Sequence, residues 1–144
     1  MSDVQLDISE WTDFDRDLLE FVKDTMPRET KKFMRREGGK LRTASRRQAR
    51  ATIKKKTGNY LKGIKNTKGW KNSQGDYGVK VNARAPHSHL LEAGHYVFRR
   101  GKNTGKRTRA FYIMRDAKSS FEGRFWNDAQ EFIHKLVDNG LKGR

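Results

Sequence analysis

Three histidines and one glutamate fall within residues 86–95, and side chains of these types can bind a metal ion. On a helix His89 and Glu92 are three positions apart and share a face. His87 and His89 point about 200° apart on the same helix, so the imidazoles do not converge on one ligand set. We therefore interpret the segment as a structural helix. The alternative is a metal-dependent enzyme that uses His87, His89 and His95.

Other catalytic patterns are weak. Ser88 stands between two histidines, but no Gly-x-Ser-x-Gly turn surrounds it. Residues 101–106 lack the glycine spacing and the Lys-Ser/Thr ending of a phosphate-binding loop. The chain has no cysteine, which excludes disulfides and thiolate sites. We expect no enzymatic activity and no cofactor.

The strongest charged pattern is a row of cations along residues 28–50. The formal net charge of +16 favours nucleic acid, anionic lipid or an acidic protein surface as partner. On a helical wheel the bases occupy one arc, opposite the apolar positions. They are Arg28, Lys31, Lys32, Arg35, Arg36, Arg42, Arg46, Arg47 and Arg50. We expect this basic ridge to bind an acidic surface, and a solvated face is the ordinary alternative. Because no aromatic residues interleave with the bases, and no helix-turn-helix or zinc-finger spacing occurs, sequence-specific DNA reading is not expected.

Charge is also segregated along the chain. Residues 1–26 hold eight acids and two bases, whereas residues 27–71 hold seventeen bases and two acids. Segments of opposite sign attract, so an acidic first helix and a basic second helix could pair within one chain or between copies.

Two helices are expected at the start of the chain. Thr12 can cap the first one, together with Asp15 three residues later. Its apolar face would be Trp11, Phe14, Leu18, Phe21 and Val22. Pro27 suits the first turn of the second helix, and Gly38-Gly39 is a weak point where that helix could kink or break. Its apolar face would be Phe33, Met34, Leu41, Ala44 and Ala51.

Short strands and turns are expected next. Residues 60–64 and 77–81 are rich in aromatic and β-branched side chains and predict a hairpin, with turn-prone residues at 66–69 and 72–76. Pro86 begins a short helix that Gly94 ends, and residues 95–98 add a third strand.

The last part of the sequence predicts a loop and a helix. Residues 99–109 are rich in bases and predict an exposed flexible loop. Apolar residues from Met114 to Leu136 keep helical spacing, and Asn139-Gly140 can end that helix. The length of 144 residues suits a single domain, residues 1–144, with a thin core. No segment predicts a membrane span or a signal peptide, so we expect synthesis in the cytoplasm and no membrane partner.

Two segments together resemble a known family. They are Lys55-Lys56-Thr57-Gly58-Asn59-Tyr60-Leu61-Lys62-Gly63-Ile64, and Ala85-Pro86-His87-Ser88-His89-Leu90-Leu91-Glu92-Ala93-Gly94-His95 after Val79-Lys80-Val81-Asn82. In order and spacing they are similar to the minor tail-component family of tailed bacteriophages, the neck, tail-completion or head-tail joining proteins. Relatives often have a proline where this chain has Arg109-Ala110-Phe111, so the sequence does not fix the residue at which the last helix begins.

The resemblance implies an α+β subunit with two N-terminal helices, a short antiparallel β-sheet and a C-terminal amphipathic helix. Such subunits assemble as a homo-oligomeric ring, of six copies by resemblance, around the DNA channel of the virion. The residues that would maintain subunit shape or contacts are Gly58, Tyr60, Pro86, His87, His89, Glu92, Gly94 and His95. No catalysis is implied.

We therefore expect a virion structural protein that joins head and tail or completes the tail, next to head-connector and tail-tube proteins. Either a neck ring or a tail terminator would fit. The ridge positions Arg35, Arg42, Arg46 and Arg50 would meet acidic surfaces of neighbouring subunits. DNA would approach only the loop bases Arg99, Arg100, Lys102, Lys106, Arg107 and Arg109. The alternative function is a non-specific nucleic-acid-binding protein of the cytoplasm.

Overall fold

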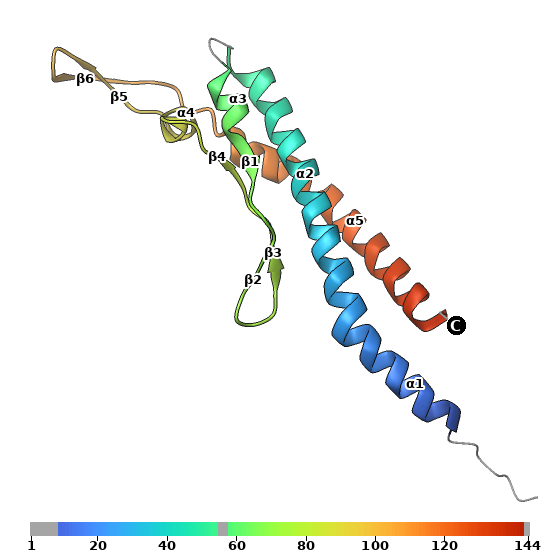
Figure 1. Ribbon diagram of the computed structural model, residues 1–144. Helices are drawn as coiled ribbons and strands as arrows, with labels where there is room; N and C mark the ends of the chain where they lie inside the picture. Colours follow the sequence, from blue (N-terminus) through green and yellow to red (C-terminus); the bar gives the residue numbers. More distant parts are fainter. Residues whose placement is uncertain (1–8, 55–57, 143–144) are drawn as a thin grey trace, which may run out of the picture.

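The computed structural model describes residues 9–54 and 58–142, with side chains from residue 13 onward (Figure 1). A long helical rod runs antiparallel to a second long helix, and small β-hairpins and short helices lie along one side of the rod. The elements in order are α1 (Ser9–Glu20), η1 (Phe21–Thr25), α2 (Met26–Thr52), α3 (Asn59–Gly63), β1 (Ile64–Asn66), β2 (Trp70–Lys71), β3 (Tyr77–Gly78), β4 (Val81–Ala83), α4 (Ser88–Ala93), β5 (Tyr96–Arg99), β6 (Lys102–Arg107) and α5 (Ile113–Lys142). The α+β class expected from the sequence is confirmed.

The two N-terminal helices are not separate, because α1, η1 and α2 form one continuous rod. η1 is a turn of π-helix in which the Met26 amide donates to the Phe21 carbonyl, five residues earlier. Pro27 lies in the first turn of α2, as expected, and it has no amide hydrogen to donate. The wider π turn keeps the backbone helical just before this proline. Thr12 lies inside α1, so its predicted role as the N-cap is wrong, and the side chains of Trp11 and Thr12 lie outside the described part.

No kink breaks α2 at its paired glycines. Gly38 is buried, and a Cβ atom built on it would lie 2.5 Å from Cγ1 of Val79, whereas one built on Gly39 would meet nothing within 4 Å. Gly38 therefore serves a close approach between the helix and the β3–β4 segment.

The core is small and lies in two places. Ala49, Tyr60, Ile64 and Ile113 form one buried cluster where α2, α3, β1 and α5 meet. Between α2 and α5, the ring of Phe33 stacks on that of Phe132 with centroids 4.5 Å apart. The expected inner face of α2 is correct at Phe33, but Ala51 is exposed, and the residues that are buried on the helix include the polar Glu37 and Ser45.

The predicted hairpin forms, but its first strand begins at Ile64 and not at residue 60. β1 pairs antiparallel with β4, and β2 with β3, around a turn in which Asn72 Oδ1 accepts hydrogen bonds from the amides of Gln74 and Asp76. Residues 60–63 are helical and belong to α3, which corrects the expected strand. Gly58 adopts a left-handed conformation, φ 74°, just before α3, and this turns the chain so that Tyr60 is buried. Residues 66–69 make no turn, since the Thr67 amide donates to the Lys80 carbonyl on the opposite arm.

The expected third strand does not join this hairpin. β5 pairs with β6 as a separate two-stranded hairpin, turning at Arg100 and Gly101, whose φ angles are 49° and 75°. The expected loop at 99–109 is therefore largely strand β6. The segment has few apolar side chains to pack. Its strand conformation is instead held by the backbone hydrogen bonds to β5 and by the hydrogen bond from Thr104 Oγ1 to the Val97 carbonyl.

α5 begins at Ile113 and continues to Lys142, so Asn139-Gly140 does not end it. A Cβ atom at Gly140 would lie 2.5 Å from Cε2 of Phe21, which means that this glycine allows close packing on η1. Across the described residues, none of the helices combines the length and apolar character needed to cross a bilayer.

Candidate functional site

The two segments that carry the family resemblance meet through Tyr60 and Glu92. The Tyr60 hydroxyl donates to Glu92 Oε1 over 2.5 Å, and the Met114 amide donates to the same carboxylate at 3.1 Å and 3.3 Å. Glu92 thus joins α3, α4 and the first turn of α5, where free amides favour a negative charge. Burial raises the pKa of the Tyr60 phenol, and the hydrogen bond to Glu92 raises it further.

Gly94 and His95 hold the base of the β5–β6 hairpin. A Cβ atom at Gly94, whose φ is 70°, would lie 2.6 Å from the Thr108 carbonyl oxygen. The His95 amide donates to Thr108 Oγ1 at 3.0 Å, and His95 Nδ1 lies 3.0 Å from the same hydroxyl. This imidazole is therefore engaged in a local structural contact.

The histidines do not form a metal site. His87 and His89 are exposed, and His87 turns the chain before α4 with φ 65°. Ser88 is buried and its hydroxyl donates to the Ala85 carbonyl, which places it as a turn-stabilising residue. Among the described residues, no three His, Cys, Asp or Glu side chains are grouped so that they could hold a metal ion. Pro86 is exposed beside His87.

The four ridge arginines lie in two different environments. Arg42 donates to Asn66 Oδ1 and Arg46 to the Ile64 carbonyl, each at 3.0 Å, and both side chains are half-buried against β1. Arg35 and Arg50 are exposed. Arg42 and Arg46 therefore hold β1 against α2, whereas Arg35 and Arg50 are open to a partner.

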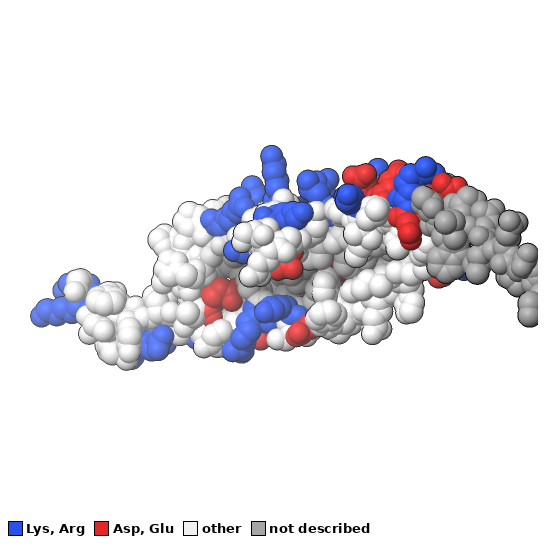
Figure 2. Space-filling view, turned by 90° about the horizontal axis from the view of Figure 1, so that it is seen from below, with Lys and Arg blue, Asp and Glu red and all other residues white. Residues whose placement is uncertain are grey.

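All six bases of residues 99–109 are exposed, and all but Arg109, which follows β6, lie on a hairpin that projects from the body at one end (Figures 1 and 2). The guanidinium of Arg107 lies 4.9 Å from the ring centroid of Tyr96. Tyr96 and Phe98 are 49% and 62% exposed, so this basic surface also carries aromatic rings. From the sequence, the bases were expected in a loop and Tyr96 and Phe98 in a strand, so the aromatic residues were not connected with the bases.

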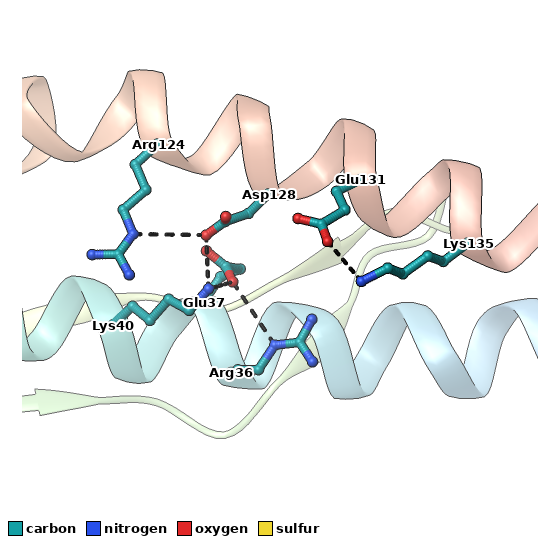
Figure 3. A network of polar contacts seen from close by, with 7 residues as sticks. All are labelled: Arg36, Glu37, Lys40, Arg124, Asp128, Glu131 and Lys135. Carbon is teal, nitrogen blue, oxygen red and sulfur yellow. Dashed lines mark hydrogen bonds and ion pairs between the residues drawn. The ribbon is translucent and has the colours of Figure 1, made fainter.

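A cluster of ion pairs between α2 and α5, in which only Glu37 is fully buried, was missed from the sequence (Figure 3). Glu37 is 2% exposed, and Lys40 Nζ lies 2.7 Å from both Glu37 Oε1 and Asp128 Oδ2. The two carboxylates raise the pKa of Lys40, and the hydrogen bond from Lys40 lowers that of Asp128. The sequence could have indicated that Glu37 is buried, because it follows Phe33 by four positions and therefore lies on the apolar side of the helix.

Beside this cluster, an open groove of about 750 Å³ separates η1 and the start of α2 from the end of α5. Apolar walls come from Phe21, Phe33, Phe132 and Leu136. At its rim the Lys135 ammonium pairs with Glu131 at 2.6 Å (Figure 3). This pairing lowers the pKa of Glu131, so this carboxylate is suited to hold an ion pair and unsuited to act as a general acid.

Comparison with protein-family models, with curated proteins and with solved structures gives no match for this chain.

Proposed function

We propose that this chain is a structural subunit of a tailed-phage virion, which joins head and tail or completes the tail. In this proposal it assembles as a homo-oligomeric ring, of six copies by resemblance, around the channel through which the genome passes. Its neighbours would be the head-connector and tail-tube proteins. No chemical reaction is part of this role.

One observation carries the proposal: the subunit leaves more large apolar side chains in solvent than it buries. Among the described residues, seven hydrophobic residues are buried, whereas thirteen large ones are exposed by 39% or more. Exposed apolar groups arranged along whole elements are typical of surfaces that a partner covers. Packing around a ring would cover them and compensate for a thin core.

The meeting of Tyr60 with Glu92 adds support. Tyr60 and Glu92 belong to the two segments that resemble the phage family and are 32 residues apart in the sequence, and a hydrogen bond of 2.5 Å joins them. In a ring, every copy must present the same surfaces to its neighbours. A hydrogen bond that fixes these two segments relative to each other would help to keep those surfaces the same.

The exposed part of the basic ridge suits contacts with other virion proteins. Arg35 and Arg50 are exposed on α2, and Arg36 and Arg47 extend the same row. A channel lined with cations would bind the phosphates of passing DNA and slow it. We therefore assign these arginines to acidic surfaces of neighbouring proteins and away from the channel.

The experiment that tests the proposal is made on virions of the phage that encodes the chain. We expect mass spectrometry of purified particles to find the protein at a copy number that fits one ring. We also expect electron microscopy of particles made without it to show unjoined heads and tails, if it is a neck ring, or overlong tails, if it is a terminator. Normal virions without the protein would contradict the proposal.

The second candidate is a non-specific nucleic-acid-binding protein, and the exposed bases of the β5–β6 hairpin favour it. Salt titration separates the two functions. A binding protein of this kind would bind any duplex as a monomer, with affinity falling steeply as salt rises. For the ring subunit we expect weak duplex binding at physiological salt.

A further inference from the structure

One end of the molecule is α1, an amphipathic helix whose apolar side lies in solvent. Phe14, Leu18 and Leu19 are 50%, 39% and 56% exposed. α1 makes its main contacts with η1, the next segment of the same rod, within the described structure. Exposed acids surround these apolar side chains, namely Asp13, Asp15, Asp17 and Glu20. A helix face of this composition is complementary to a surface that is both basic and apolar.

The other end of the molecule is the β5–β6 hairpin, which has that composition. Tyr96 and Phe98 are exposed on β5, and every residue of β6 is exposed. Residues 96–109 contain six bases and no acid. In the described structure β5 and β6 make their main contacts with each other, so both faces of the hairpin are open beyond its base.

The two ends cannot meet within one chain. They lie at opposite ends of an elongated molecule, with the length of α2 between them, as the views from two directions agree (Figures 1 and 2). Figure 2 shows acidic atoms gathered toward the α1 end, while the projecting hairpin shows basic and uncharged atoms. Because α1 and α2 are one rod, the acidic helix cannot fold back on the basic one either.

We propose that α1 of one copy docks on the β5–β6 hairpin of the next copy. Phe14 and Leu18 would cover the rings of Tyr96 and Phe98, and the acids of α1 would face the bases of the hairpin. Two different surfaces of the chain meet in this contact, so it is heterologous, and repetition closes a ring when the rotation between copies allows it. The inference rests on the proposed function, since it names the surfaces that join the subunits of that ring.

DNA is the other acidic partner that this hairpin could bind. The aromatic residues favour the protein partner, because Tyr96 and Phe98 gain from an apolar helix face and a duplex backbone offers them none. Bases alone would suffice for phosphate binding. The hairpin is therefore assigned to α1 of a neighbour.

Cross-linking tests the contact directly, because the 144-residue chain has no cysteine of its own. Arg16→Cys on α1 and Asn103→Cys on the hairpin keep every acid of α1 and every base of the hairpin. We expect an equimolar mixture of the two variants to form a disulfide-linked dimer under mild oxidation. Ser119→Cys, on an exposed position of α5, is the control, and its mixture with Arg16→Cys should give about tenfold less product.

Charge reversal then tests the chemistry of the contact in the same cysteine pair. One set reverses α1 (Asp15→Lys, Asp17→Lys and Glu20→Lys), and a second reverses the hairpin (Arg99→Glu, Lys102→Glu and Lys106→Glu). Either set alone should lower cross-linking by about tenfold or more, and the two sets in opposite partners should restore it. A control set with the same change in net charge as the hairpin set lies on α3, on β1 and just after β1 (Lys62→Glu, Lys65→Glu and Lys68→Glu). These three lysines are exposed, and their reversal should leave the product unchanged. Circular dichroism confirms that each variant is folded.

The outcomes separate this inference from the proposed function. If virions contain the chain as a ring but the two cysteines do not cross-link, the contact is wrong and the function stands. If cross-linking and its rescue succeed but virions lack the chain, the contact stands and the function is wrong. Should hairpin reversal abolish duplex binding and leave cross-linking unchanged, DNA is the partner of the hairpin and the inference is overturned.

Discussion

At the scale of single residues, Glu92 is the side chain that links three elements of the fold. Its carboxylate accepts hydrogen bonds from the Tyr60 hydroxyl and from the Met114 amide, so one side chain fixes three elements relative to one another. The family resemblance implied that these residues maintain subunit shape or contacts, and the structure brings two of them, Tyr60 and Glu92, together. His87 and His89 belong to the same motif, but both are exposed and lie outside this junction.

Tyr60→Phe removes the hydroxyl and leaves the ring in place. Since hydrogen bonds to charged groups contribute about 1.5–3 kcal/mol, we expect the free energy of unfolding to fall by about 2 kcal/mol. Urea denaturation measures the change. Tyr77→Phe is the matched control, because the Tyr77 ring lies over Lys71 and its interaction does not depend on the hydroxyl. An equal loss in both variants would contradict the role of the Glu92 bond.

The raised pKa of Tyr60 makes this stabilisation depend on pH. Above the ordinary value of 10.0, the unfolded chain loses the phenolic proton while the folded chain retains it. Deprotonation then favours unfolding, so the contribution is intact below pH 10 and is lost as pH rises. We expect the stability advantage of the native chain over Tyr60→Phe to narrow between pH 9 and pH 11. A constant difference would show that the phenol is not shifted.

Lys40 compensates the charge of a buried carboxylate. Lys40→Met would leave Glu37, which is 2% exposed, with only the more distant Arg36, whose Nε lies 4.0 Å from Glu37 Oε1. We expect a loss of about 2–4 kcal/mol in unfolding free energy. Lys135→Met also breaks an ion pair between a lysine and a glutamate, but in solvent, and it should change stability little. Chemical denaturation of both variants gives the comparison. In the double variant Glu37→Leu with Lys40→Met, much of the loss should be recovered.

At the scale of elements, the glycines of α2 show why helix propensity alone misled. Two adjacent glycines predict a weak point, but Gly38 faces Val79 and the helix continues through both positions. Packing of the β3–β4 segment against the helix requires a residue without a Cβ atom there. The same reasoning applies to Gly140, which packs on Phe21 and does not end α5.

Gly38→Ala and Gly39→Ala should therefore have opposite effects. Both gain about 1 kcal/mol in helix propensity, but only Gly39→Ala keeps that gain, because nothing lies within 4 Å of its new methyl group. Gly38→Ala would place a methyl group against the stiff side chain of Val79 and should lower the free energy of unfolding by about 1–3 kcal/mol. Thermal denaturation measures both. Stabilisation by Gly38→Ala would contradict the close approach.

At the scale of the whole molecule, the two ends carry opposite charge and the body carries most of the excess of bases. Salt should then act in two directions. Screening weakens an assembly contact between exposed charges, and it relieves the self-repulsion of a chain with net charge +16.

We expect the dissociation constant of the homo-oligomer to rise about tenfold between 0.05 M and 0.5 M salt, a range over which the screening length shrinks severalfold. Analytical ultracentrifugation measures it. Over the same range the melting temperature of the subunit, measured on dilute protein, should stay constant or rise. Assembly that strengthens with salt would indicate a contact dominated by apolar burial.

The sequence by itself determined the helices, the hairpin and the segregation of charge, because periodicity, turn residues and formal charges are local properties of the chain. It did not determine that the first two helices are one rod, since the π turn before Pro27 depends on backbone bonds and not on residue type. Tertiary structure alone decided which arginines are free: Arg42 and Arg46 bind β1, while Arg35 and Arg50 remain in solvent. It also decided that the acidic and basic apolar surfaces lie at opposite ends, because distance in space depends on how the elements pack.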